Sequence, residues 1–254
     1  FATATAGVNA VPYNALAADI VWTDVTDLVE AVSIQRGRST ELDTFSTGSA
    51  SVRLDNSDRR FDPDYGPAWL VLPGIANNNV TSLVNGTWTT RNNLDVRVRC
   101  AATTWANGSS QTLIGQATSA SNQQWRFSLA PTGLLRLFYS TNGSTQVNVD
   151  STAIPTFTNG QSYWMRVTRN ATTGVVTFYT APDSPIEPAA WTQLGSTVAS
   201  ITGAYYASTS NIEIGSKYAG TQELFAGYIR RVLVSSTIGA AAFADFDPAS
   251  ITSA

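Results

Sequence analysis

The side chains in this sequence that could carry out acid–base chemistry are carboxylates, because the 254 residues contain no histidine and a single cysteine, Cys100. Without histidine, serine–histidine and cysteine–histidine catalysis are excluded, as are zinc sites built from histidine and cysteine ligands. A glycosidase needs two carboxylates about 5–9 Å apart across a cleft. The nearest candidates are Glu213 and Glu223, but they stand ten positions apart with Gly215 and Gly220 between them. We therefore expect no enzyme activity, no catalytic residues and no cofactor.

A second group of carboxylates lies near the N-terminus, where two arginines are interspersed with Asp55, Asp58, Asp62 and Asp64. Oxygen ligands at such a density could hold calcium. The spacing lacks the glycine and the distal glutamate of an EF-hand loop, and Arg59 and Arg60 stand inside the cluster. Ion pairs that lock a turn are the better interpretation, since each guanidinium has a carboxylate within local reach. We predict no metal site here.

Aromatic residues beside turn signals are the candidates for a sugar-binding surface, because such sites combine exposed rings with polar side chains on loops. Trp105 precedes Asn107-Gly108, and Tyr205 and Tyr206 follow Gly203. The alternative is that these rings plug the ends of a β-sandwich. The tryptophans in or beside expected strands are assigned to the core: Trp88, Trp125, Trp164 and Trp191.

The charge distribution divides the chain into two parts. Residues 1–66 contain five arginines and ten acidic residues, a net charge of −5, whereas residues 67–254 have a net charge of +2. The change falls at about Tyr65–Leu72, a stretch marked by proline and glycine, and predicts modules at 1–68 and 69–254. Neither module has the basic stripe that nucleic-acid binding requires. No apolar run approaches the ~18 residues of a membrane span.

The second module predicts many short strands. Leu94 to Cys100 alternates apolar with charged residues, and Trp125, Phe127 and Leu129 alternate with polar ones. Similar alternation recurs around Leu135–Tyr139, Tyr163–Val167, Val176–Thr180, Ile212–Ile214 and Tyr228–Val234, with Asn-Gly and Thr-Gly turn signals among them. In the first module, residues 49–54 alternate in the way a half-buried strand does. The pattern is typical of an all-β protein with a sandwich in the second module.

The first module also carries ordered motifs. Trp22-Thr23-Asp24-Val25-Thr26 is followed by Gly37-Arg38-Ser39 and Leu42-Asp43, then by Leu54-Asp55-Asn56-Ser57-Asp58-Arg59-Arg60-Phe61-Asp62-Pro63. This pattern resembles the N-terminal module of minor tail proteins of tailed bacteriophages. The resemblance implies a tail-assembly role for Arg38, Asp55, Arg59, Arg60, Phe61 and Asp62. We expect Phe61 to be buried.

The second module resembles the concanavalin A-like, laminin-G-like jelly roll. The resemblance covers roughly residues 85–250 and depends on the order of Gly160–Val167, Gly174–Tyr179, Trp191–Gly195, Ile212–Ser216 and Phe225–Ile229. It implies a small N-terminal β module followed by a jelly-roll sandwich. Calcium binding, common in laminin-G-like domains, is not expected, because Asp95, Asp150 and Asp183 are isolated from other carboxylates.

The function predicted from these features is a structural component of a phage tail tip or baseplate. The N-terminal module would dock on other tail proteins, and the jelly roll would be displayed outward from a symmetric homo-oligomer in the virion. The alternative is a receptor-binding module that binds host-surface glycans through Trp105, Tyr205 and Tyr206. A cell-wall glycosidase is the third hypothesis.

Overall fold

A computed structural model describes residues 2–4, 22–24, 29–35, 49–54, 69–82 and 92–248. The chain divides into two compact units, Phe1–Pro67 and Ala68–Ala254, and each is described by itself. All tail-assembly residues predicted above (Arg38, Asp55, Arg59, Arg60, Phe61 and Asp62) lie outside the described residues, as does Trp88. No helix within the described part of the chain is long and apolar enough to span a membrane.

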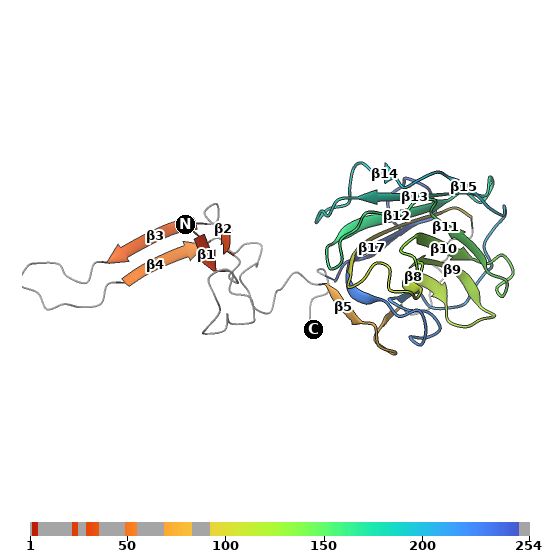
Figure 1. The fold of residues 1–254 in the computed structure, drawn as a ribbon, viewed down its shortest axis with the longest axis horizontal. Coiled ribbons are helices and arrows are strands. Elements are labelled where there is room, and N and C mark those ends of the chain that lie inside the picture. The colour runs from red at the N-terminus through yellow and green to blue at the C-terminus, as the bar shows by residue number, and fades with distance from the viewer. Residues whose placement is uncertain are drawn as a thin grey trace, which may run out of the picture. The chain divides into compact units, whose positions relative to one another are not determined.

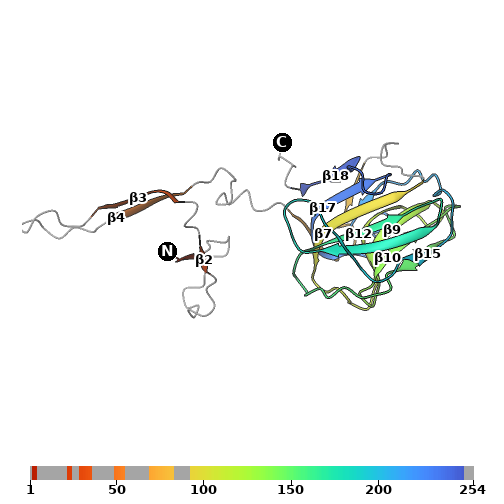
Figure 2. The ribbon, with the colours of Figure 1, turned by 90° about the horizontal axis from the view of Figure 1, so that it is seen from above.

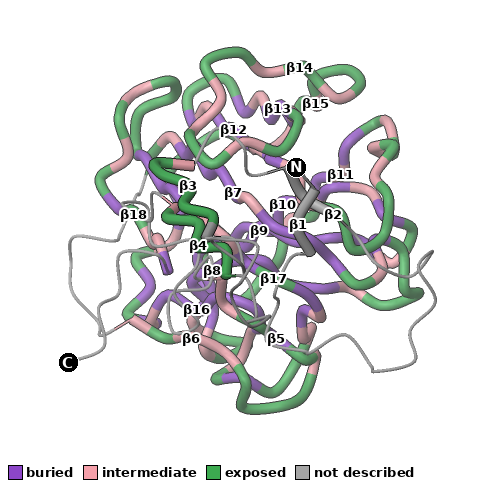
Figure 3. Tube along the Cα trace, turned by 90° about the vertical axis from the view of Figure 1, so that its left-hand side faces the viewer, coloured by how far each residue is buried: buried purple, intermediate pink, exposed green. Residues whose placement is uncertain are grey.

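The first unit contains two antiparallel strand pairs. Strand β1 (Ala2–Ala4) pairs with β2 (Trp22–Asp24), and β3 (Val29–Gln35) pairs with β4 (Ser49–Leu54). The strand predicted at residues 49–54 is confirmed, but it is not half-buried, because its residues up to Arg53 are exposed (Figure 3). In this pair Val32 lies opposite Val52 and shares a face with Ile34.

The second unit is a sandwich of two sheets, so the predicted all-β sandwich is confirmed (Figure 1). The six-stranded sheet has the order β11-β10-β9-β8-β16-β6, with strands β6 (Val80–Thr81), β8 (Gln111–Ala117), β9 (Gln123–Leu129), β10 (Leu135–Tyr139), β11 (Val147–Asp150) and β16 (Glu213–Ile214).

The eight-stranded sheet has the path β14-β13-β12-β7-β17-β18, with β15 added to β13 and β5 added to β17. Its strands are β5 (Leu70–Pro73), β7 (Leu94–Ala102), β12 (Tyr163–Arg169), β13 (Val175–Ala181), β14 (Thr192–Gln193), β15 (Val198–Ala199), β17 (Ala226–Ser235) and β18 (Ala244–Phe246).

The core lies between the two sheets because alternate residues of each strand face inward. Leu94, Val96, Val98 and Cys100 of β7 are buried in one cluster with Trp125 and other residues of the opposite sheet. Figure 2 shows β7, β12 and β17 in one layer and β9 and β10 in the other. The alternation read from the sequence therefore identified the core-facing positions correctly.

One turn depends on glycine because of a close backbone approach. Gly174 has a φ of +70°, and a Cβ there would lie 2.2 Å from the carbonyl oxygen of Ser200. Asn170 organises this turn by accepting hydrogen bonds from the N–H groups of Thr172 and Thr173 at 2.9 and 3.1 Å. The turn joins β12 to β13 and holds the segment that leads from β15 to the end of the sandwich.

Candidate functional site

Trp105 is a core residue, not the exposed sugar platform expected from the sequence. Its side chain is only 6% exposed and its ring packs against Phe157, with centroids 4.7 Å apart, and against Tyr163. The indole Nε1–H donates to the carbonyl oxygen of Thr158 at 2.9 Å. Because both the ring and its one polar atom are engaged inside the fold, Trp105 plugs an end of the sandwich.

Tyr205 is also buried, with 2% of its surface exposed, and its ring meets Tyr139 edge-on at 5.6 Å. The guanidinium of Arg169 lies over both tyrosine rings, 4.5 Å from that of Tyr205 and 4.2 Å from that of Tyr139. Burial raises the pKa of the Tyr205 hydroxyl. Tyr206 is half-buried and lies beside Gly143. Trp105 and Tyr205 therefore offer no exposed platform, and for these two rings the alternative, that they plug the sandwich, holds.

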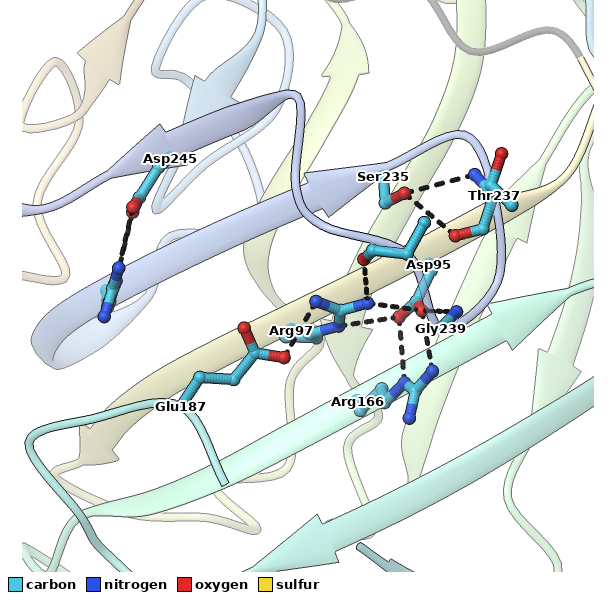
Figure 4. A network of polar contacts seen from close by, with 10 residues as sticks. Asp95, Arg97, Arg166, Glu187, Ser235, Thr237, Gly239 and Asp245 are labelled. Atoms are coloured by element: carbon cyan, nitrogen blue, oxygen red, sulfur yellow. Dashed lines mark hydrogen bonds and ion pairs between the residues drawn. The ribbon is translucent and has the colours of Figure 1, made fainter. Parts of the chain in front are cut away.

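The polar face of the eight-stranded sheet carries an ionic network around Asp95, whose partners are arginines (Figure 4). Its carboxylate accepts hydrogen bonds from Arg97 at 2.8 and 3.2 Å, and from Arg166 at 2.7 and 2.9 Å. The N–H of Gly239 donates a further bond at 2.8 Å. Asp150 and Asp183 likewise pair with Arg136 and Arg99.

The Asp95 network is closed to ligands because its groups are already occupied. Arg97 also donates to Glu187 and to the carbonyl oxygen of Ala240, each at 2.8 Å, so two loops are tied onto the face of the sheet. Beside the network, a small apolar cluster of Trp164, Ala181 and Leu233 is covered by Trp191 and Ala242. We assign this face a structural role.

The outer face of the six-stranded sheet offers a different arrangement, based on Arg126 and Phe138. The Arg126 guanidinium lies 4.2 Å above the Phe138 ring, a cation–π geometry. Gly115 of the next strand makes room for it, since a Cβ there would lie 2.5 Å from Cγ of Arg126. Burial lowers the pKa of Arg126, and Glu223 opposes this shift.

Amide side chains converge on Arg126. Its Nη1 donates to Oε1 of Gln123 at 2.8 Å, and the same oxygen accepts from Nε2 of Gln146 at 2.7 Å. A shallow surface depression lies here, lined by Gln123, Gln124, Trp125, Arg126, Phe138, Tyr139 and Gln146. Of these lining residues Gln146 is exposed, whereas the others are buried, Arg126 with 1% and Gln123 with 3% of its surface exposed. The Gln146 amide can therefore reach a ligand from the rim of the depression.

A strained loop borders this depression. Tyr218, Ala219 and Glu223 have φ values of 57°, 56° and 48°, although none is glycine. Such conformations cost roughly 1–2 kcal/mol per residue and persist only where the surroundings enforce them. Glu213 supplies part of that enforcement, because its buried carboxylate accepts from the N–H groups of Ala219 and Gly220 at 2.8 and 3.2 Å.

The loop places charged and aromatic groups beside Arg126. Lys217 lies 4.7 Å from the Tyr218 ring centroid and forms a 2.7 Å ion pair with Glu223. The other Glu223 oxygen accepts from the Thr112 hydroxyl at 2.9 Å and lies 3.6 Å from Nε of Arg126. We call Gln123, Arg126, Phe138, Gln146, Lys217, Tyr218 and Glu223 together the Arg126 face.

Glu213 and Glu223, the two carboxylates considered for glycoside hydrolysis, are engaged in other contacts. Glu213 is buried and holds the loop, so a substrate cannot reach it. Glu223 is occupied by Lys217 and Thr112. In the described part of the chain, no three His, Cys, Asp or Glu side chains are grouped to hold a metal ion.

Sequence reasoning missed the Arg126 face because it searched for aromatic rings on loops. The signal that was present is Gln124-Trp125-Arg126-Phe127, where polar residues alternate with core residues on a strand. That alternation assigns Arg126 to the outer face. The loop that closes over it comes from residues about ninety positions later, and no local pattern predicts that contact.

Comparison with known proteins finds no matching family model and no matching curated protein. Among solved structures, the CBM40 of the Ruminococcus gnavus IT-sialidase, bound to alpha2,3 sialyllactose, aligns with a TM-score of 0.42 and 10% identity, covering 66% of this chain and 95% of that one. A heptameric SAP-like pentraxin from Limulus polyphemus aligns with a TM-score of 0.43 and 18% identity, covering 65% and 73%. At these scores the similarity carries no argument about what this chain binds.

Proposed function

We propose that the β-sandwich is a carbohydrate-binding module whose ligand site is the Arg126 face. One observation carries the proposal: the exposed amide of Gln146 stands at the rim of a shallow depression beside a loop held in a strained conformation, and buried Gln123 and Arg126 hold that amide in place. Side-chain amides donate and accept hydrogen bonds together, which matches the hydroxyl groups of sugars. The positive charges of Arg126 and Lys217 lie beside Glu223, which suits an uncharged sugar.

The test is binding of the full chain to a glycan array, followed by titration calorimetry on the best ligand. Gln146→Ala and Tyr218→Ala should each weaken binding about fivefold or more, the effect of losing one hydrogen-bonding or ring contact. Gln193→Ala is the matched control, because Gln193 is an exposed amide on β14 of the other sheet. If Gln146→Ala and Tyr218→Ala bind like the parent chain, the Arg126 face is not the site.

A second proposal concerns the first unit: that it docks on other phage tail proteins, so that the chain is a virion component with the sandwich displayed outward. The resemblance of residues 22–63 to minor tail proteins supports it. A described feature supports it as well, since Val32, Ile34 and Val52 on β3 and β4 are 52–73% exposed. A two-stranded pair is marginally stable alone, and covering this face would stabilise it.

The test of docking is incorporation of the chain into assembled tail particles. Ile34→Lys should abolish or strongly reduce incorporation without lowering the melting temperature of the sandwich. Ile186→Lys serves as the control, because Ile186 is equally exposed, at 71% against 73%, but belongs to the second unit. Equal incorporation of both variants would contradict docking through this face, and no incorporation of the parent chain would contradict the tail location itself.

A further inference from the structure

Strand β17 contains a β-bulge at Arg230. Ile229 pairs with Cys100 of β7 and Arg231 pairs with Arg99, so Arg230 is an extra residue in the ladder. Ile229 faces the core, whereas Arg231 pairs with Asp245 on the outer side. Bulges re-aim side chains and are often found next to functional sites. Here the bulge adds one arginine to the outer surface of the eight-stranded sheet.

Arg230 lies against aromatic side chains. Its guanidinium carbon is 4.4 Å from the Trp69 ring centroid, and the Trp69 ring meets Tyr228 edge-on at 5.6 Å. Tyr228 is 37% exposed, and its cross-strand neighbour Val71 is 57% exposed. The result is an accessible apolar surface with a guanidinium held at its edge, over the pairing of β5 with β17.

Arg230 forms no ion pair within the described residues. Its Nε donates to the Ser162 hydroxyl at 2.6 Å, which is a neutral partner. Neighbouring arginines differ, since Arg99 pairs with Asp183 at 2.7 Å and Arg231 pairs with Asp245 at 2.7 Å. Burial lowers the pKa of Arg230 and the charge of Arg99 lowers it further, while the charge of Asp183, which is paired with Arg99, opposes this only in part. A second anion beside the guanidinium would stabilise its charged form.

We propose that Trp69, Tyr228 and Arg230 form a second binding site, for the carboxylate of an acidic sugar. The guanidinium offers a planar pair of N–H groups that matches a carboxylate in bidentate fashion. The exposed Tyr228 ring and the Val71 side chain offer an apolar surface to the sugar ring beside it. This site lies on the opposite sheet from the Arg126 face and does not depend on it.

The experiment measures binding of the full chain to an array of uronic-acid and sialic-acid oligosaccharides, each beside its carboxyl-reduced form. At least one acidic member should bind, and its reduced form should bind about tenfold more weakly or worse, since a charge-assisted hydrogen bond is lost. Arg230→Gln should weaken binding of the acidic sugar by the same factor. Binding should also weaken as salt rises, because the attraction is screened.

Matched variants separate this site from general charge and from folding. Arg231→Gln removes the same charge one residue away and should bind like the parent chain, as should Gln146→Ala on the Arg126 face. Arg230→Lys keeps the charge without the planar fork and should give intermediate affinity, with melting temperatures checked for each variant. The proposal is overturned if no acidic sugar binds, if acidic and reduced forms bind equally, or if Arg230→Gln has no effect. Stronger Arg230-dependent binding of a glutamate-rich peptide would also overturn it.

Discussion

Arg166 on β12 donates two hydrogen bonds to the carboxylate of Asp95 on the neighbouring strand β7, at 2.9 and 2.7 Å. Asp95 is fully buried, and Arg97 of its own strand reaches the same carboxylate. One carboxylate therefore joins two strands and, through Gly239, a loop that follows β17. Neutralising the Asp95 carboxylate would leave the guanidinium groups of Arg97 and Arg166 without their shared partner.

Asp95→Asn should lower the free energy of unfolding by about 3–5 kcal/mol, because breaking a buried pair leaves an uncompensated charge. Urea denaturation measures this. Asp245→Asn is the control, since Asp245 and Arg231 form a more exposed pair that should contribute about 0–1 kcal/mol. Equal losses for the two variants would contradict the role assigned to Asp95.

Stability should fall in acid because of Asp95. Burial raises the pKa of the Asp95 carboxyl, but hydrogen bonds from Arg166, Arg97 and Gly239 outweigh this, and the net pKa is lowered. A group with a lowered folded pKa stabilises the protein above its unfolded pKa, about 3.9, and that contribution is lost as pH falls through the folded value. Urea midpoints between pH 7 and pH 2 should show a smaller acid loss in Asp95→Asn than in the parent chain; parallel profiles would contradict this.

Gly115→Ala should destabilise the sandwich by about 1–3 kcal/mol through overpacking. The new Cβ would lie 2.5 Å from Cγ of Arg126. In an Arg126→Ala background the same substitution should cost less, because the shortest contact is gone, while the contacts at 2.9 Å with Cβ of residue 126 and with the carbonyl oxygen of Trp125 remain. A double-mutant cycle by urea denaturation measures this coupling, and additive effects would show that Arg126 does not occupy the space above Gly115.

Ala219→Gly should leave stability unchanged or raise it by up to about 1 kcal/mol, because the left-handed φ of 56° suits glycine. The contrasting variant is Ala106→Gly, an exposed alanine without a positive φ, which should lose about 0.5–1 kcal/mol to backbone entropy. Melting temperatures compare the two, and an equal loss in both would mean that the loop is not strained.

The local sequence was sufficient to predict where strands form and which face of the sheet their side chains point to. Leu94, Val96 and Val98 alternate with charged residues, and since a strand sends successive side chains to opposite faces, their core position followed directly. Trp125 and Trp164 were assigned to the core because they lie in or beside strands. Trp125 is in the core between the sheets, whereas Trp164, although fully buried, belongs to the small cluster on the outer face of the eight-stranded sheet. Trp191 was assigned with them, but it is half-buried and packs on the outer-face cluster.

Tertiary structure decided what covers each polar face. Asp95 and Arg126 both alternate with core residues and both are buried, Asp95 by loops around Glu187 and Gly239 and Arg126 by the loop that carries Glu223. The Asn-Gly turn signal next to Trp105 predicts an aromatic side chain on a loop. Phe157 and Tyr163, more than fifty positions away, bury that side chain instead. Alternation is set by the geometry of a single strand, whereas covering a face needs contacts between segments far apart in the chain, which only the assembled sandwich supplies.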